Sequence, residues 1–245
     1  MVSGMADIVV AHLSDLHIGL GAGHDLWGRD PSRTLAAVLA ELEGLHPDIA
    51  LLSGDLTDAG DVASTQYVAD AARTLAPTVR WLAGNHDNPA SLRAVESSWS
   101  EPVSVGAWTV IPVESYVEGE WFGHITESEV ARVERVLMQM STPYAALAVH
   151  QPPTGMCEAP GCQLDNAAVI FALADRITGL KVVFSGHQHH AFVHVRDGVT
   201  YVGGGSTCMQ VDHVGDGFEP RTEGPMFAVV RLGDNGAVSV DHREC

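Results

Sequence analysis

The sequence predicts an α/β fold built around parallel strands. Three short apolar segments, residues 8–13, 49–52 and 79–82, alternate with two segments of helical character. This alternation is typical of parallel strands joined by right-handed helical crossovers. Each apolar segment ends in a turn that carries Asp, Asn or His. Ligands bind at the carboxyl ends of such strands, so we expect a site at that edge of the sheet.

Length and composition limit the possible functions. The 245 residues suit one domain, 1–245, with a large core, because 46% of them are hydrophobic. No apolar run approaches the roughly 18 residues that a membrane span needs, and residues 1–7 lack a signal-peptide pattern, so we expect a cytoplasmic protein. The net charge of -18 argues against a broad nucleic-acid surface, which needs Lys and Arg. We expect Cys157 and Cys162 to be reduced, as is usual in the cytosol.

The first two helices have local sequence signals. Asp30-Pro31 is typical of an N-cap followed by the first helical residue, and the apolar residues from Leu35 to Leu45 recur at helical spacing. A second helix is expected over residues 62–75.

The second half of the chain repeats the alternation. Residues 103–113 are β-like with a break at Gly106, and Thr126 and Glu129 form a capping box that opens a helix reaching about Met140. A hairpin is indicated by the turn at residues 234–236. The remaining predicted elements are strands at 145–149, 181–184, 199–202, 227–232 and 237–241 and a helix at 166–177.

The turn after residues 181–184 is rich in histidine. In extended backbone, residues i and i+2 point the same way, so His187 and His189 are expected to aim at one point. Imidazole is the commonest metal ligand among side chains. The alternative is a surface loop that is merely rich in histidine.

Side chains of the same kind follow four other strands, and they are Asp15, His17, Asp55, Asn85, His86 and His150. Any one of them is explained by a turn or a surface position, but five strand ends together favour a metal site. The mixture of carboxylate, amide and imidazole suits Mn, Fe or Zn. Without His86, and with His187 and His189, these side chains provide seven candidate ligands. Seven ligands suit two ions about 3.5–4 Å apart that share a carboxylate. Such ions would also supply the positive charge that an anionic substrate needs.

Five sequence blocks, in this order, resemble the calcineurin-like metallophosphoesterases. The blocks are Asp15-Leu16-His17, Gly54-Asp55-Leu56-Thr57-Asp58-Ala59-Gly60, Gly84-Asn85-His86-Asp87, His150-Gln151-Pro152 and Gly186-His187-Gln188-His189. The resemblance implies a four-layer α/β/β/α sandwich of two mixed β-sheets, with a dinuclear metal centre between the sheets.

The resemblance also implies the ligands of each ion. The first ion would be held by Asp15, His17, Asp55 and His189, and the second by Asp55, Asn85, His150 and His187. Asp55 would bridge the two ions, which we expect to be iron or manganese, with zinc as an alternative. A hydroxide that bridges the metals would be the nucleophile.

Catalytic roles follow from the same motif positions. Asn85 and the metals would hold the phosphoryl oxygens. His86 would be the general acid on the leaving oxygen. Asp58 would pair with His86 and set its tautomer, although a turn residue is the alternative. Asp87 is expected to brace its turn.

A narrower resemblance, to the bacterial class III 3′,5′-cyclic-AMP phosphodiesterases, rests on residues 123–126, 155–163 and 206–210. It implies substrate contacts by Asn85, His86, Thr207 and Gln210. The amide of Gln210 suits a purine edge, because it both donates and accepts hydrogen bonds, and an ordinary loop amide is the alternative. Gln151 departs from many relatives, which have a second histidine there.

We therefore expect a dinuclear phosphodiesterase that hydrolyses a small molecule, 3′,5′-cyclic AMP, to AMP. One alternative is a broader phosphodiesterase or a phosphomonoesterase. Another is a non-catalytic protein-binding scaffold, whose members typically lose the catalytic histidine or the ligands. A homodimer is left open. All five tryptophans are expected to pack inside, and a cover over the site is the alternative for Trp121, which lies in a loop. They are Trp27, Trp81, Trp99, Trp108 and Trp121.

Overall fold

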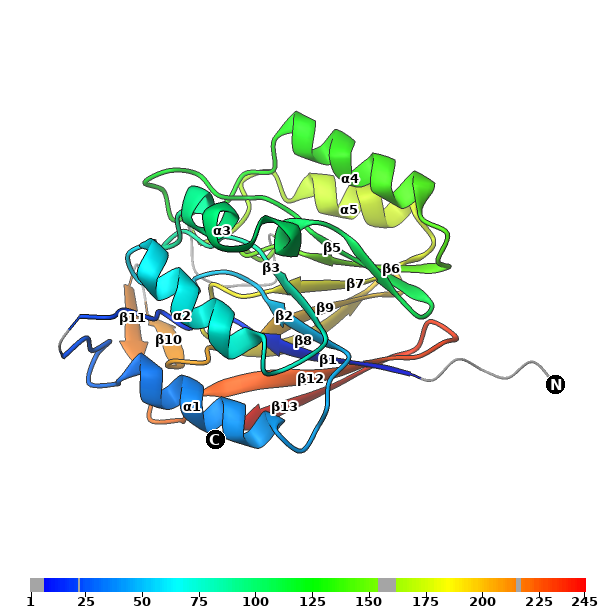
Figure 1. Cartoon of the computed structure of the whole chain (residues 1–245). Helices are drawn as coiled ribbons and strands as arrows, with labels where there is room; N and C mark the ends of the chain where they lie inside the picture. Colours follow the sequence, from blue (N-terminus) through cyan, green and yellow to red (C-terminus); the bar gives the residue numbers. More distant parts are fainter. Residues whose placement is uncertain (1–6, 22, 154–161, 215–216) are drawn as a thin grey trace.

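Two large β-sheets lie face to face in the computed structural model, which describes residues 7–21, 23–153, 162–214 and 217–245 (Figure 1). The first sheet has the strand order β13 (Val238–Glu244), β12 (Met226–Leu232), β1 (Ile8–Leu13), β2 (Ile49–Leu52) and β3 (Thr78–Trp81). The second has the order β4 (Val103–Val105), β5 (Trp108–Pro112), β6 (Tyr144–Ala148), β7 (Leu180–Ser185), β9 (Val199–Gly204) and β8 (Ala191–Arg196). Both sheets are mixed: β1, β2 and β3 run parallel in the first sheet, and β5, β6, β7 and β9 run parallel in the second.

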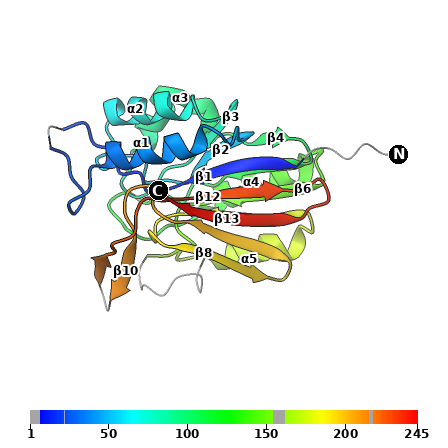
Figure 2. The ribbon, with the colours of Figure 1, turned by 90° about the horizontal axis from the view of Figure 1, so that it is seen from below.

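Helices cover the outer faces of the two sheets, as Figure 2 shows. The first sheet is covered by α1 (Pro31–Leu42), α2 (Val62–Ala72) and α3 (Pro89–Glu96), the last followed by the short 3-10 helix η1 (Ser97–Ser100). The second sheet is covered by α4 (Glu127–Gln139) and α5 (Ala168–Arg176). The expected four-layer α/β/β/α sandwich is therefore confirmed. Within the described part of the chain, every helix is too short or too polar to cross a membrane.

The alternation of side chains along β1 explains why the layers stack. Ile8 and Val10 pack into the core between the sheets, against Trp108 and Phe184 of the facing sheet. Ala11 and Leu13, which point the opposite way, pack beneath α1 and α2. Both faces of this strand are buried, so its sequence is apolar except at His12 rather than alternating.

The predicted helix starts hold, with one difference. Asp30 caps α1 by accepting from the amides of Ser32 and Arg33. Thr126 caps α4 by accepting from the Glu129 amide at 3.2 Å. The Glu129 carboxylate does not complete the capping box, because it accepts from the Glu114 amide at 2.8 Å and binds an arginine one turn along the helix.

A two-stranded ribbon, β10 (Val211–Val214) and β11 (Gly217–Pro220), stands apart from both sheets. It projects from the end of the sandwich that lies away from the N-terminus (Figure 2). The sequence reading missed this ribbon, as well as α3 and β8, because their apolar residues follow no clear period. The predicted hairpin between β12 and β13 is confirmed, with Gly236 at a φ of 84° in its turn. The single-domain organisation of residues 1–245 stays a prediction.

Candidate metal centre and its cleft

Five of the seven residues predicted as metal ligands have left-handed backbone. Positive φ angles occur at Asp15 (54°), His17 (48°), Asp55 (48°), His187 (68°) and His189 (47°). Such angles are uncommon outside glycine and are concentrated at functional sites. The expectation of extended backbone at His187 and His189 is therefore wrong. The left-handed turn aims these two imidazoles at two neighbouring points instead of one.

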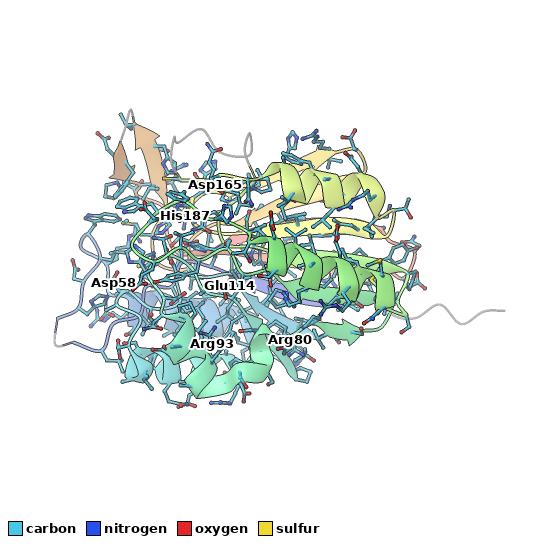
Figure 3. The ribbon with its side chains drawn as sticks, turned by 90° about the horizontal axis from the view of Figure 1, so that it is seen from above. Asp58, Arg80, Arg93, Glu114, Asp165 and His187 are labelled. Atoms are coloured by element: carbon cyan, nitrogen blue, oxygen red, sulfur yellow. The ribbon has the colours of Figure 1, made fainter. Side chains whose placement is uncertain are left out.

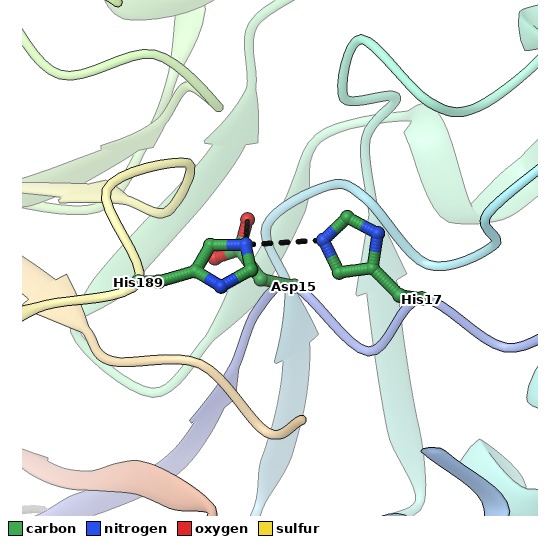
Figure 4. A group of neighbouring side chains, drawn as sticks. All are labelled: Asp15, His17 and His189. Carbon is green, nitrogen blue, oxygen red and sulfur yellow. Dashed lines mark hydrogen bonds and ion pairs between the residues drawn. The ribbon is translucent and has the colours of Figure 1, made fainter. Parts of the chain in front are cut away.

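The first cluster consists of Asp15, His17 and His189 (Figure 4). The Nε2 atoms of the two histidines are 3.0 Å apart, and the Nε2 of His189 lies 3.6 Å from Asp15 Oδ1. His189 Nδ1 is 2.7 Å from the Met209 carbonyl and donates to it, which leaves the Nε2 lone pair aimed at the cluster. Two ligand nitrogens about 2.1 Å from one ion and at right angles would lie about 3 Å apart. The cluster therefore fits a metal ion.

The second cluster consists of Asp55, His150 and His187. His150 Nδ1 donates to the Ser53 carbonyl at 2.7 Å, and His150 Nε2 lies 3.3 Å from Asp55 Oδ2. Within the described chain, the Nε2 atoms of both histidines and Oδ1 of Asn85 are buried without a hydrogen-bond partner. Buried polar atoms normally have partners, and a cation would serve all three at once.

Asp55 lies between the two clusters. Its Oδ2 is 3.8 Å from His17 Nε2 on one side and 3.3 Å from His150 Nε2 on the other. Its Oδ1 accepts from the His86 amide at 2.9 Å. One carboxylate thus faces both clusters, which is the arrangement that a shared ligand requires.

The electrostatics of the site favour cation binding. Burial alone would raise the pKa of Asp55, but His150 and His17 hold this pKa well below its ordinary value. Burial lowers the pKa of His187 well below its ordinary value and that of His189 to about 4, so both rings are neutral at pH 7. Neutral imidazoles beside an ionised carboxylate are in the protonation state that metal ligation needs. His150 differs, because burial would lower its pKa but Asp55 raises this pKa to about 9, so a cation would have to displace a proton from this ring.

His86 lies at the mouth of the site, and 40% of its side chain is exposed. Its Nδ1 is 3.4 Å from Asp58 Oδ1, and its ring meets that of His17 edge to face. The same Asp58 oxygen is 3.4 Å from His17 Nδ1, and the interaction with His17 lowers the pKa of Asp58. Asp58 is therefore shared by both histidines. Asp87 accepts from the backbone amides of residues 56, 57 and 84 and braces the turn.

Thr207 and Gln210 are not placed as expected for substrate contacts. Gln210 is 3% exposed, and its amide is paired with both backbone groups of Ser206, accepting from N at 3.1 Å and donating to O at 2.7 Å. Thr207 is fully buried, and its amide donates to the Ser14 carbonyl at 2.8 Å. Neither Thr207 nor Gln210 is among the described residues that line the cleft. Thr207 ties the segment to the first ligand turn, and Gln210 braces the segment internally.

The cleft above the clusters has walls that the sequence indicated only in part. Its lining contains His86 and five of the predicted ligands, which are His17, Asp55, Asn85, His187 and His189. It also contains Trp121, the candidate cover, and Cys162 of the predicted substrate loop, together with Leu26, Trp27, Val211, His213 and Phe218. Trp27 is 50% exposed and Trp121 is 58% exposed, so the expectation that these two pack inside is wrong, and Trp121 instead borders the cleft. Residues 155–161 of the predicted substrate loop, and with them Cys157, lie outside the described residues. The only feature of the sequence that could have placed Trp27 at the cleft was its position in a glycine-rich loop.

The labelled side chains in Figure 3 orient the site within the molecule. Asp58 and His187 lie toward the end of the sandwich from which the β10–β11 ribbon projects, on opposite sides of the junction between the sheets. Arg80 lies farther from that end. The strand ends of both sheets therefore contribute to one site.

Comparison with known proteins agrees with this geometry. Residues 8–191 match the profile of the Calcineurin-like phosphoesterase family. A 3′,5′-cyclic-nucleotide phosphodiesterase of Nostoc sp. is 28% identical over 94% of this chain and 89% of its own length. The 3′,5′-cyclic adenosine monophosphate phosphodiesterase CpdA of Pseudomonas aeruginosa is 26% identical over 94% and 88%. A dimetal phosphatase from Danio rerio has the same fold, with a TM-score of 0.67, 10% identity and coverage of 95% and 98%.

Proposed function

Because the chain belongs to the calcineurin-like phosphoesterase family, a family of hydrolases, we propose that it hydrolyses 3′,5′-cyclic AMP to AMP. One observation supports this most: Asp55 faces both His/Asp clusters, and the clusters lie beside a half-exposed histidine, His86. This arrangement combines sites for two cations with a proton donor at the mouth of one cleft.

The donor set fits two metal ions, which we propose to be iron or manganese, with zinc as the alternative. Asp15, His17, Asp55 and His189 would hold one ion, and Asp55, Asn85, His150 and His187 would hold the other. When bound, the cations would polarise the phosphoryl group and lower the pKa of water.

The residues of the chain would bind the phosphodiester and protonate the leaving group. The Asn85 amide lines the cleft and would hold a phosphoryl oxygen. As a bond forms between the attacking water oxygen and phosphorus, the bond from phosphorus to O3′ breaks. His86 would give its proton to O3′. Asp58, next to Nδ1 of His86, would keep that nitrogen protonated and leave Nε2 to serve as the acid.

The choice of cyclic AMP rests on the relatives named for cyclic-nucleotide hydrolysis, which align with nearly the whole chain. A non-catalytic scaffold would be expected to lack ligands or the catalytic histidine, and this chain has all of them. A broader phosphodiesterase or a phosphomonoesterase would use the same clusters, so the substrate must be tested directly. A cytoplasmic location and a homodimer stay predictions.

The test is a substrate panel on protein of measured metal content. Cyclic AMP, cyclic GMP, bis(p-nitrophenyl) phosphate and p-nitrophenyl phosphate would be compared at equal concentration, with Asp55→Asn as the blank for contaminating enzymes. We expect cyclic AMP to be hydrolysed with a higher kcat/KM than the aryl monoester. Rapid hydrolysis of the aryl diester without measurable turnover of cyclic AMP would replace the proposal with a general phosphodiesterase.

A further inference from the structure

Three aromatic side chains form the outer wall of the cleft above the metal clusters. Trp27 meets Phe218 edge to face with ring centroids 4.7 Å apart, and Trp121 lies 6.5 Å from Phe218. Both tryptophans are at least half exposed, although large aromatic rings are normally covered. We call Trp27, Trp121 and Phe218 the aromatic wall.

The backbone of Trp27 is held in a conformation that suits glycine. Leu26 and Arg29 exchange both backbone hydrogen bonds, at 2.8 and 3.1 Å, and enclose a two-residue turn with φ of 48° at Trp27 and 84° at Gly28. Turns of this kind favour Asn or Gly at both positions. A bulky residue with positive φ is an outlier, and such outliers point to function when the surroundings hold them in place.

The turn that carries Trp27 is tied to the segment that follows Phe218. The Arg29 guanidinium donates to the backbone carbonyls of Arg221, Thr222 and Glu223, at 3.4, 3.1 and 2.7 Å. One arginine therefore keeps the loop with Trp27 next to the ribbon with Phe218. The wall is held in position even though its rings are exposed.

Trp121 is tied to the metal centre through Gln151, the residue after the ligand His150. Gln151 is buried, donates from Nε2 to the Trp121 carbonyl at 3.3 Å, and accepts at Oε1 from Ser115 at 2.8 Å. Gln151 is therefore a positioning residue that joins a ligand turn to the wall.

We propose that the aromatic wall binds the base of a nucleotide whose phosphate lies at the metal clusters. This proposal deepens the proposed function and rests on it. The cleft offers cation sites at its floor and exposed aromatic faces at its rim, so its ligand should join an anionic group to a flat ring. Base stacking on aromatic side chains provides affinity without hydrogen bonds to the base. The wall, rather than Gln210, would then distinguish a nucleotide from a simple phosphate ester.

Binding of two anions to manganese-loaded protein tests this proposal without turnover. AMP and ribose 5-phosphate both carry a phosphate on ribose, but only AMP has a base. Calorimetry should show that the wild type binds AMP more tightly than ribose 5-phosphate. Trp27→Gly should weaken AMP binding about tenfold and leave ribose 5-phosphate binding unchanged. Trp27→Phe should retain most of the AMP affinity, because a ring remains.

The stability of Trp27→Gly separates a binding role from a packing role. Glycine tolerates the positive φ at position 27, so the variant should unfold within a few degrees of the wild type. Tyr67→Leu, which removes an exposed ring from α2, is the matched control and should bind AMP as the wild type does. Trp121→Leu provides a second wall variant with the same expected loss.

The outcomes separate this inference from the proposed function. Equal affinity for AMP and ribose 5-phosphate in the wild type, or AMP binding that neither tryptophan variant weakens, would overturn the wall as a base site. A loss of AMP affinity accompanied by an equal loss for ribose 5-phosphate would also overturn it. Absence of cyclic AMP hydrolysis with base-dependent AMP binding intact would overturn only the proposed reaction.

Discussion

The floor and the rim of the cleft are built in different ways. The floor consists of ligand turns that directly follow the buried strands β1, β2, β3, β6 and β7. Both of its candidate ligand carboxylates, and all its candidate ligand imidazoles except the partly buried His187, are buried. The rim consists of aromatic side chains on the β10–β11 ribbon and on loops, and its two tryptophans are at least half exposed and lie on segments held by a few hydrogen bonds.

This difference suggests a division of labour between reaction and substrate choice. The floor carries the groups that any phosphoester hydrolysis on two cations requires, and close packing holds them in place. Under our proposal the rim would touch parts of a substrate that do not react, so it could change without disturbing the floor. Changes in the floor should therefore abolish the reaction, whereas changes in the rim should alter affinity for particular substrates.

The largest effect is expected from Asp55→Ala, because Asp55 faces both clusters. We expect the purified variant to lose most of both metals and at least about 10³-fold in kcat. Elemental analysis together with initial rates would measure both losses. Two full equivalents of metal in this variant would contradict the role of Asp55 as the shared ligand.

Gly84→Ala should damage the floor without removing any ligand. A Cβ at position 84 would collide with Asp55 Oδ1 and with His150 Nε2, both of which are fixed by packing. We expect metal affinity to fall roughly 10–100-fold, as when a residue that orients ligands is changed. The control is Gly44→Ala, where an added Cβ has open space. Similar metal titrations for both variants would show that the floor is less rigid than we infer.

His86→Ala should separate binding of the metals from proton donation. The variant should keep its metal content, because the His86 ring is not among the proposed ligands. Turnover of cyclic AMP should fall roughly 10²–10⁴-fold, while an aryl diester, whose leaving group needs little protonation, should lose less. Equal losses on both substrates would remove His86 from the role of general acid.

A smaller, pH-dependent effect is expected from His12, which lies beneath the floor and bonds Ser53 at 2.7 Å. Burial lowers the folded-state pKa of His12 to about 3. As the pH falls, His12 is therefore protonated in the unfolded chain before it is protonated in the folded chain. The stability that the neutral buried ring contributes is complete above about pH 6.5 and is lost as the pH falls toward 3. The stability advantage of the wild type over His12→Gln should shrink by about 1 kcal/mol between pH 7 and 5.5. Denaturant unfolding at both pH values measures the free energy of unfolding of each protein. The same difference between the two proteins at both pH values would contradict the low pKa of His12.

Much of the fold could be predicted from the sequence because its signals are local. The spacing of apolar residues located β1 and β2, and Asp30 and Thr126 identified the starts of α1 and α4. Polar residues directly after apolar strands also indicated the floor, since parallel strands bring their carboxyl ends to one edge. The ribbon β10–β11 was missed because its short strands have no such pattern.

The sequence by itself indicated which residues meet at the floor, and only the tertiary structure decided the backbone conformation that brings them there. Left-handed backbone at His187 and His189 sends neighbouring imidazoles to different clusters, and such φ angles depend on distant contacts such as the hydrogen bond from the His187 amide to Asp15. Gln210 turned inward because its amide found backbone partners in Ser206. Trp27 reached the cleft because Arg29 binds carbonyls almost two hundred residues away along the chain. Local periodicity contains no information about contacts between such distant segments.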